Sequence, residues 1–460
     1  QMQINQNIFR AYDIRGIASE DLSDEFVSAL GSALSHQIKK LGLKQVAVAR
    51  DGRLSGERIC STLINSFLDN GVNVINVGMV PSPLLYFAVE KFKTKNGVMI
   101  TGSHNPKEYN GFKIILGGKT IFGQEIQDIK NYILQGIYSK DIKKGHLEER
   151  DVLNDYIDEL KNNISLKRPM KICLDCGNGV GGMIAPQAFK EIGCEVIELF
   201  SEVDGNFPNH HPDPGNPMNL KDLQNKIKES NADIGIALDG DADRVGIVDN
   251  SGKIIYPDIQ MILYADQVLM KNKNATIIFD VKCSNLLKNF IEENSGIAYM
   301  SKTGHSYIKK NLFEKNALLA GEMSGHIFFN DRWFGFDDAI YAGSRMLEIL
   351  SEKEKSSSEI FSELPQNLST PEINISVSDE NKFLIMSKLI EILKKENGEI
   401  SSLDGIRIDK DSSWGLIRAS NTSPNLVLRF EGNTSQDLDQ IKNVFKKAIS
   451  KVDNTIKTNF

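Results

Sequence analysis

The chain has 460 residues, which at roughly 150 residues per domain predicts about three domains. With 40% hydrophobic and 25% charged residues, the composition excludes a disordered chain and a fibre. The net charge is −7 and no basic run is present, which argues against nucleic-acid binding. An anionic ligand must therefore be held by a few cations in a cleft.

One pattern of strand, helix, strand and strand occurs three times. The three copies open with apolar strands at 45–53, 170–179 and 275–284. The helix that follows is predicted to end at Gly71, Gly193 or Gly296 in a left-handed residue. The second and third strands are predicted at 72–77 and 97–100, at 194–200 and 233–238, and at 297–300 and 317–320. Three α/β units of one design are therefore expected.

The remaining segment, from about residue 366, has another pattern. It predicts strands at 373–377, 415–419 and 425–430 and helices at 381–395 and 435–452, typical of a smaller α+β domain. The fold class is thus α/β with four expected domains, at 1–149, 150–253, 254–365 and 366–460.

Cysteine usage and targeting signals indicate the compartment. The cysteines are odd in number and scattered, so a disulfide framework is not expected (Cys60, Cys173, Cys176, Cys194 and Cys283). The C-x-x-C of Cys173 and Cys176 lies in an apolar run and is interpreted as buried strand thiols. No signal peptide or membrane-helix pattern is present. We expect a cytoplasmic protein.

The third strand of each unit leads into a polar loop, at 101–106, 239–244 and 321–326. In open α/β sheets ligands bind beyond the carboxyl ends of the strands. We therefore expect the three loops to face one cleft.

The second loop carries Asp239, Asp241 and Asp243, spaced so that three carboxylates can converge on Mg²⁺ or Ca²⁺. An EF-hand is excluded, because Arg244 stands at its sixth position and Asn250 at its twelfth. The alternative is a solvated acidic turn, but the neighbouring Arg244 favours an anion beside a metal.

Ser103 lies in the first loop, where a turn or N-cap serine is the ordinary alternative. The G-x-S-x-G motif of esterases is not matched, because Asn105 replaces the second glycine. A serine opposite a carboxylate metal site suggests phosphoryl transfer, and His104 could exchange protons. If Ser103 is only a turn residue, a pure binding module remains possible.

Two further segments have weaker signals. Glu322 and Ser324 could grip sugar hydroxyls or simply belong to a helix cap. The segment 418–422 could cradle a phosphate with a guanidinium, hydroxyls and N–H groups, or form a polar hairpin turn.

A competing motif favours an NAD-dependent oxidoreductase. Residues 177–182 fit G-x-G-x-x-G after a strand, and Glu198 follows at about the required distance. However, Glu198 falls inside the next predicted strand instead of at its end, and the three aspartates stay unexplained. A P-loop sequence is absent.

Seven motifs together resemble the α-D-phosphohexomutases, and within them the bacterial phosphomannomutase/phosphoglucomutase group. They lie in the family's order at 9–16, 101–106, 110–113, 239–244, 302–305, 321–326 and 418–422. The resemblance covers the whole chain and implies four domains around a central cleft. It also implies reversible phosphoryl transfer between the 1- and 6-positions of mannose and glucose phosphates, through a phosphoserine and a hexose 1,6-bisphosphate.

The resemblance also implies residue roles. Ser103 would carry the phosphoryl group and join Asp239, Asp241 and Asp243 around Mg²⁺. The sugar hydroxyls would meet His305, Glu322 and Ser324, and the non-reacting phosphate would meet Arg418, Ser420, Asn421 and Thr422. Other cleft positions would be Tyr12, Arg15, Lys113, Arg244, Lys282 and His326, among which Arg15, Lys113 and His326 are candidates for proton transfer or charge stabilisation. Glucose 1,6-bisphosphate would serve as activator and intermediate, and a monomer is expected.

Two positions qualify the resemblance. Glucosamine-phosphate enzymes usually have Gln where Met323 stands, which leaves a phosphoglucosamine mutase only as an alternative. Ala242 stands where the family commonly has Gly, so a positive φ there would add strain and weaken metal affinity.

Overall fold

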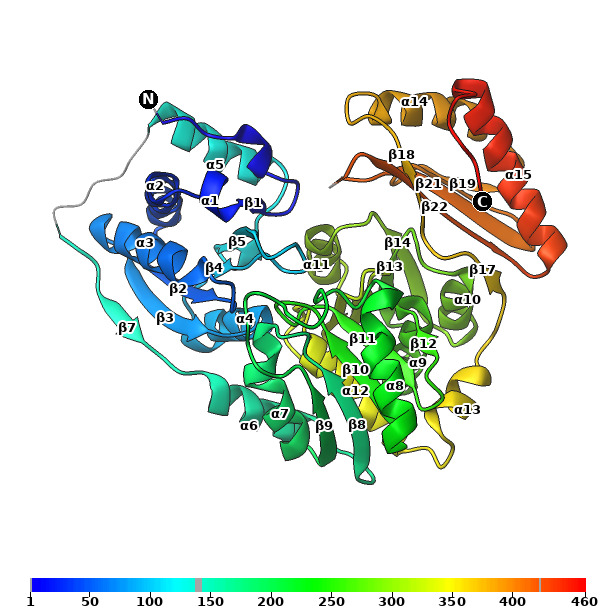
Figure 1. Cartoon of the computed structure of the whole chain (residues 1–460), viewed down its shortest axis with the longest axis horizontal. Helices are drawn as coiled ribbons and strands as arrows, with labels where there is room; N and C mark the ends of the chain where they lie inside the picture. The colour runs from blue at the N-terminus through cyan, green and yellow to red at the C-terminus, as the bar shows by residue number, and fades with distance from the viewer. Residues whose placement is uncertain (1, 137–142, 422) are drawn as a thin grey trace.

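The computed structural model describes residues 2–136, 143–421 and 423–460. Its strands form four separate sheets, one after another along the chain. In Figure 1 the blue and cyan first domain lies on the left, the orange and red fourth domain at the upper right, and the green and yellow second and third domains between them. The predicted fold class of three similar α/β domains and a smaller α+β domain is confirmed.

The first domain is built on its sheet and the helices that pack on it. The strands are β1 (Ile14–Ile17), β2 (Gln45–Arg50), β3 (Asn73–Met79), β4 (Gly97–Ile100), β5 (Tyr109–Leu116), β6 (Lys119–Thr120) and β7 (Leu147–Glu149). The helices are η1 (Gln6–Ile8, 3-10), α1 (Ala18–Asp21), α2 (Asp24–Lys40), α3 (Gly56–Asp69), α4 (Ser82–Phe92) and α5 (Gln124–Gln135). The strand order is β1-β5-β4-β2-β3-β7, with β6 paired to β5.

Helix α2 shows how the local sequence sets an element. The Ser23 hydroxyl caps its start by accepting the N–H of Phe26 at 3.1 Å. Acidic residues occupy its first turn and basic residues its last, as the helix dipole favours. Phe26, Leu30 and Leu34 recur at helical spacing and are buried, so this face packs into the core.

The second domain contains strands β8 (Met170–Asp175), β9 (Cys194–Leu199), β10 (Ile234–Leu238), β11 (Val245–Asp249) and β12 (Ile254–Ile255). Its helices are α6 (Leu153–Asn163), η2 (Val180–Met183, 3-10), α7 (Ala185–Glu191), η3 (Pro217–Leu220, 3-10) and α8 (Lys221–Ser230). The strand order is β12-β11-β10-β8-β9.

The third domain contains strands β13 (Thr276–Asp280), β14 (Ile297–Ser301), β15 (Leu319–Gly321) and β16 (Ile327–Phe329), in the order β14-β13-β15-β16. Its helices are α9 (Pro257–Lys271), α10 (Asn285–Glu293), α11 (His305–Glu314), α12 (Ala339–Ser351) and α13 (Ser357–Ser362).

The three sheets share one arrangement, β3-β2-β4-β5, β9-β8-β10-β11 and β14-β13-β15-β16. The first three strands of each set are parallel, and the last is antiparallel. The sequence analysis missed these fourth strands, because each follows its polar loop within a few residues. The loops therefore connect antiparallel neighbours and sit at corresponding ends of the three sheets.

The predicted helix ends are right at two positions and wrong at the third. Gly71 and Gly193 have φ of 77° and 115°. At the third helix Ser295 takes the left-handed conformation, with φ of 65°, in place of Gly296. A Cβ at Gly296 would lie 2.7 Å from Cγ2 of Ile291, so this glycine is needed for space.

The fourth domain is an antiparallel sheet covered by two helices. The strands are β17 (Leu368–Ser369), β18 (Ile373–Ser376), β19 (Glu399–Ser401), β20 (Ile406–Asp409), β21 (Ser413–Ala419) and β22 (Asn425–Gly432), and the helices are α14 (Lys382–Leu393) and α15 (Ser435–Val452). The strand order is β17-β22-β21-β20-β19, with β18 also paired to β22. Helix α15 has the predicted bounds, whereas the short or charged strands β17, β19 and β20 were not predicted.

The first three domains pack together more closely than the fourth packs on them. One continuous hydrophobic cluster includes Tyr86 of the first domain, Tyr156 of the second and Phe336 of the third. The fourth domain has its own core and meets the third through hydrogen bonds, ion pairs and a small apolar cluster of Val281, Trp414 and Leu416. Arg407 donates to the carbonyls of Val281 and Cys283, each at 2.7 Å. The fourth domain is therefore a separate packing unit.

All five cysteines are buried and free, and the prediction of buried thiols at Cys173, within β8, and Cys176, directly after it, is confirmed. Among the helices of the described ranges, none has the length and apolar character needed to cross a membrane.

Candidate active site

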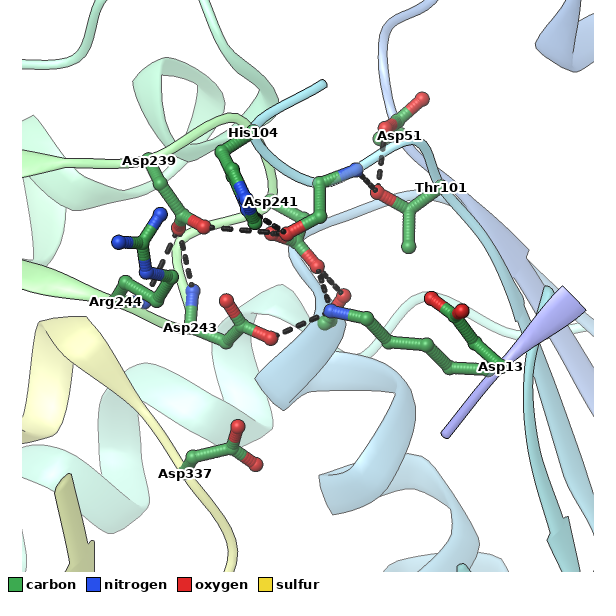
Figure 2. Close-up of polar contacts among 12 residues, drawn as sticks. Asp13, Asp51, Thr101, His104, Asp239, Asp241, Asp243, Arg244 and Asp337 are labelled. Carbon is green, nitrogen blue, oxygen red and sulfur yellow. Dashed lines mark hydrogen bonds and ion pairs between the residues drawn. The ribbon is translucent and has the colours of Figure 1, made fainter. Parts of the chain in front are cut away.

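Ser103 sits in the loop between β4 and β5, with 2% of its surface exposed. Its φ is +53°, in the left-handed region that is strained for a residue with a Cβ. Its hydroxyl oxygen lies 3.2 Å from Oδ1 of Asp241 and 3.4 Å from Oδ2 of Asp239. The serine of the first domain thus faces the carboxylates of the second (Figure 2).

The three aspartates come from the loop between β10 and β11 and are fully buried. One oxygen from each lies within 4.8 Å of the others. Asp239 uses Oδ1 to accept the backbone N–H groups of Asp243 and Arg244, both at 3.1 Å. These bonds close the loop on itself and leave the other oxygen of Asp239 turned toward Ser103.

The first domain fixes the other two carboxylates. Oδ2 of Asp241 accepts the Ser82 hydroxyl at 2.5 Å and the Lys113 ammonium at 2.6 Å. The same ammonium lies 2.6 Å from Oδ2 of Asp243. Ser82 also donates its N–H to the carbonyl of Asp241 at 3.0 Å. Residues of β5 and of the start of α4 therefore hold the loop of the second domain in register with Ser103.

The residues present fit a divalent cation. Oδ2 of Asp239 and Oδ1 of Asp241 contact the Ser103 hydroxyl, and Oδ1 of Asp243 is buried without a hydrogen-bond partner in the described part of the structure. Burial, together with the charges of Asp243 and Asp241, raises the pKa of Asp239 well above its usual range. Carboxylate oxygens beside a serine hydroxyl are hard ligands of the kind that Mg²⁺ takes.

Ala242 has φ of +59°. This is the positive φ that adds strain when alanine replaces glycine at this position. Alanine costs roughly 1–2 kcal/mol more than glycine in this region. The loop bears the strain because the N–H of Ala242 donates to Asp239 and its carbonyl accepts the N–H of Ala339.

Two basic side chains border the carboxylates. Burial lowers the pKa of Lys113, but Asp241 and Asp243 outweigh it and raise the pKa well above its usual range. His326 lies next to them, with Nδ1 2.7 Å from Oδ2 of Asp337. Burial lowers its pKa too, whereas Asp243 and Asp337 raise it, and the net shift is upward.

The loop between β15 and β16 presents Glu322 and Ser324. Oε1 of Glu322 accepts the N–H of Gly304 at 2.7 Å, and Oε2 accepts the Ser324 hydroxyl at 2.9 Å. His305 stacks on His326 with ring centroids 5.1 Å apart. Burial and the His326 charge lower the pKa of His305 to about 4, so its imidazole is neutral at pH 7. The three predicted sugar-contacting residues therefore lie together.

The predicted phosphate-binding residues lie at the end of β21 in the fourth domain. Arg418 donates Nε–H to Asp404 at 3.0 Å, and Ser420 is buried. The Asn421 amide reaches the hydroxyl of Tyr12 at 3.3 Å, and that hydroxyl donates to the carbonyl of Thr303 at 2.7 Å. Tyr12 thus joins the first, third and fourth domains. Thr422 lies outside the described residues.

The remaining predicted residues surround the serine loop and the two neighbouring loops. Arg15 hydrogen-bonds to Asn105 and Asp13. His104 has Nδ1 3.4 Å from the Ser103 hydroxyl, and burial, with Arg244 and Arg15, lowers its pKa well below the usual value.

Two more cations link neighbouring segments. Arg244 donates Nε–H to the carbonyl of Ser324 at 2.7 Å and contacts Asp213 at 3.1 Å. Lys282 lies 3.5 Å from the carboxylate of Glu372. The structure thus brings the described residues of the predicted site to the facing loops of four domains.

Residues 177–182, the glycine-rich segment that suggested an oxidoreductase, pack against the loop that carries the three aspartates. A Cβ at Gly179 would lie 2.8 Å from the carbonyl oxygen of Gly240, and the N–H of Val180 donates to that carbonyl at 3.1 Å. The segment leads into the 3-10 helix η2 and packs behind the aspartate loop. Glu198 lies within β9 and contacts Lys190. A dinucleotide site is therefore not favoured.

Family profiles match along nearly the whole chain. They are described as phosphoglucomutase/phosphomannomutase α/β/α domains I, II and III and the C-terminal domain, and they match residues 6–139, 154–252, 256–368 and 372–448. The chain belongs to the phosphoglucomutase/phosphomannomutase family. The resemblance drawn from the seven motifs is confirmed, and with it the enzyme class of a phosphohexomutase.

Relatives in this family are similar over their full length. A phosphomannomutase/phosphoglucomutase of Pseudomonas aeruginosa is 50% identical over 454 residues, covering 99% of this chain and 98% of that protein. A phosphoglucomutase of Neisseria meningitidis is 48% identical over 455 residues, covering 98% and 99%. A crystal structure of a family protein from Burkholderia thailandensis superimposes with a TM-score of 0.93 at 42% identity, covering 99% of both chains.

The structure adds residues that the sequence analysis missed, among them Ser82, Asp337 and the pair Asp51 and Arg53. A signal for Asp51 was present, because the first strand of each unit ends in or is followed at once by an aspartate. These aspartates are Asp51, Asp175 and Asp280. Ser82 and Asp337 belong to no repeated motif; Ser82 contacts Asp241 across a domain boundary, and Asp337 contacts His326 within the third domain.

Proposed function

We propose that the chain transfers a phosphoryl group reversibly between the 1- and 6-positions of mannose and glucose phosphates. The observation that carries the proposal is the buried Ser103 hydroxyl, which lies 3.2 Å from a carboxylate of the Asp239–Asp243 cluster. Membership of the family supports the same reaction. We also propose a monomeric, cytoplasmic enzyme with domain limits near 149, 253 and 365.

The reaction begins with a phosphorylated Ser103. The free hydroxyl oxygen of a hexose 1- or 6-phosphate attacks phosphorus and the bond from phosphorus to Oγ breaks; the sugar hydroxyl proton passes to a base in the cleft, and Oγ takes up a proton from an acid there. The product of this step is a hexose 1,6-bisphosphate and an unphosphorylated serine. The bisphosphate then reorients, and its other phosphoryl group returns to Oγ by the reverse chemistry.

Asp239, Asp241 and Asp243, together with the oxygen at Ser103, would hold Mg²⁺. When bound, this cation supplies positive charge next to the phosphoryl oxygens, where negative charge develops during transfer. Lys113 contributes a second fixed positive charge beside the same oxygens, since its raised pKa keeps it protonated. His326, backed by Asp337, is suited to carry the proton, and Arg15 and Arg244 add further cations near the serine.

The substrate binds in two orientations, with either its 1- or its 6-position facing Ser103, and the same residues must contact it in both. Glu322 and Ser324 offer an acceptor and a hydroxyl to a pair of sugar hydroxyls, and the neutral His305 adds another partner. Arg418, Ser420 and Asn421, with Thr422, would bind whichever phosphate points away from Ser103, and Lys282 would assist. Because the fourth domain is a separate packing unit, its closure could exclude water from the phosphoserine.

The experiment that tests the function combines a coupled assay with intact mass. We expect purified enzyme, given glucose 1,6-bisphosphate, to convert mannose 1-phosphate to mannose 6-phosphate and to carry the mass of one phosphoryl group that maps to Ser103. Phosphatase treatment should remove the added mass, and the bisphosphate should restore it. Conversion without any phosphorylated form would contradict the proposal.

Arg418→Ala is expected to raise KM for mannose 1-phosphate by about 10- to 100-fold, because a charged hydrogen bond contributes roughly 1.5–3 kcal/mol. The effect on kcat should be smaller, since Arg418 binds the phosphate that does not react. Lys451→Ala, at the exposed last turn of α15 in the same domain, is the control and should leave both constants unchanged. An unaltered KM in the Arg418 variant would refute the assignment.

A further inference from the structure

Ser103 adopts a backbone conformation that its own sequence does not favour. With φ of +53° it resembles Ala242 on the facing loop, whose N–H and carbonyl are both held by neighbouring backbone. Such conformations persist only where the surroundings fix them. The contacts of the Ser103 backbone should therefore reveal what holds the reactive hydroxyl in place.

The N–H of Ser103 is fixed by a two-step relay. It donates to Oγ1 of Thr101 at 2.8 Å, and the Thr101 hydroxyl donates to Oδ2 of Asp51 at 2.6 Å (Figure 2). Asp51 also accepts the N–H of Gly102 at 3.3 Å and, through Oδ1, the N–H of Arg53 at 3.0 Å. Because the Thr101 proton is committed to the carboxylate, its oxygen is free to accept from Ser103.

The carbonyl side of the loop is fixed by one guanidinium. Nη2 of Arg53 donates to the carbonyls of Ser103 at 3.1 Å and Asn105 at 2.7 Å. Nη1 donates to the carbonyls of Pro106 at 2.6 Å and Tyr109 at 3.0 Å. One side chain thus binds four carbonyls of the loop that contains the serine. A planar fork of donors can do this, and a lysine cannot.

The same guanidinium is enclosed on its other sides. Arg53 is 2% exposed, and its Nε lies 3.4 Å from Oδ2 of Asp51. The ring of Phe207, from the second domain, lies 5.2 Å from the guanidinium carbon. A Cβ at Gly102 would lie 2.3 Å from that carbon, so glycine is required where the loop crosses it.

We propose that Asp51, Thr101 and Arg53 are positioning residues for phosphoryl transfer, holding both backbone ends of Ser103 so that its Oγ points at Asp239 and Asp241. This inference rests on the proposed function of Ser103. None of the three contacts the sugar-binding or phosphate-binding residues by a hydrogen bond or ion pair that the described part of the structure contains. Their loss should therefore misplace the reacting oxygen without weakening substrate binding.

The test measures kcat and KM separately in three variants. Thr101→Val keeps the side-chain shape but removes the hydroxyl, and Arg53→Lys keeps the charge but loses the fork. Both should lower kcat by about 10- to 100-fold, the effect of a small misplacement of a reacting group, with KM for mannose 1-phosphate changed by less than about threefold. Thr101→Ser restores the hydroxyl and should recover kcat to within about threefold of wild type.

A matched control separates positioning from folding. Arg345 is 1% exposed in α12, where it binds Asp331 and Gln267 far from the serine loop in the sequence and in a different domain. Arg345→Lys should lower the melting temperature as much as Arg53→Lys does and leave kcat unchanged. Thr101→Val tests the relay even if loss of the Arg53 fork unfolds the first domain.

The outcomes of these experiments test the positioning role separately from the proposed mutase function. A wild-type enzyme without mutase turnover would overturn the proposed function. An active wild type beside a Thr101→Val variant with full kcat, or with a raised KM and unchanged kcat, would overturn the positioning role alone. Equal loss of kcat in Arg345→Lys and Arg53→Lys would also overturn it, because the effect would then be one of general stability.

Discussion

Replacing Ser103 by alanine is expected to lower kcat of the mutase reaction by at least about 10³-fold, because the oxygen that carries the phosphoryl group is gone. The fold should survive. Within the described residues the polar contacts of the Ser103 side chain are long, at 3.2 to 3.4 Å, and alanine meets the same backbone strain as serine at a φ of +53°. The measurements are steady-state turnover of mannose 1-phosphate, a thermal melt and the intact mass after incubation with glucose 1,6-bisphosphate.

The matched control for this variant is Ser35→Ala. Ser35 is also buried, but its hydroxyl donates to the carbonyl of Gly31 within α2 and makes no hydrogen bond to a site residue in the described part of the structure. This variant should retain full turnover and still take up one phosphoryl group. If Ser103→Ala kept normal turnover, or still took up the phosphoryl group at an unchanged level, Ser103 would not be the carrier.

Removing divalent metal with EDTA is expected to reduce turnover by at least about 100-fold, and added Mg²⁺ should restore it. The physical reason is the crowding of negative charge at Asp239, Asp241 and Asp243, three buried carboxylates, of which Lys113 pairs with two at 2.6 Å and His326 lies 3.9 Å from one. Binding of Mg²⁺ should also stabilise the fold, by about 2.7 kcal/mol at 100 times Kd. A melt with and without Mg²⁺ reports this effect independently of activity.

The variant Asp239→Asn tests whether Mg²⁺ binds at the three aspartates. The amide oxygen can still accept the N–H groups of Asp243 and Arg244, so the loop should keep its shape. Because a repelling charge is removed, the metal-free variant should melt at or above the wild-type temperature, while the rise caused by Mg²⁺ and the turnover are both lost. Retention of the Mg²⁺-dependent rise in this variant would show that the cation binds elsewhere.

Much of this organisation could be predicted from local sequence. The apolar strands β2, β8 and β13 and the turns that follow them gave the threefold repeat, because buried strands and glycine-punctuated turns follow from short-range chemistry. The spacing of Asp239, Asp241 and Asp243 predicted a cluster for the same reason. The fourth strand of each unit was missed because it follows its polar loop within a few residues, and in the third unit β16 has only three residues in which to show a period.

By itself, the sequence determined which loops carry chemistry, how many domains there are and which family they form, because these follow from patterns within a few tens of residues. Only the tertiary structure decided what fixes each group: Ser82 on Asp241, Asp337 on His326, and Arg53 on four carbonyls of the serine loop. The first of these contacts joins two domains, and the other two join separate segments of one domain. A hydrogen bond needs its donor and acceptor placed to within a few tenths of an ångström, and only the packing of elements and domains against one another sets such distances.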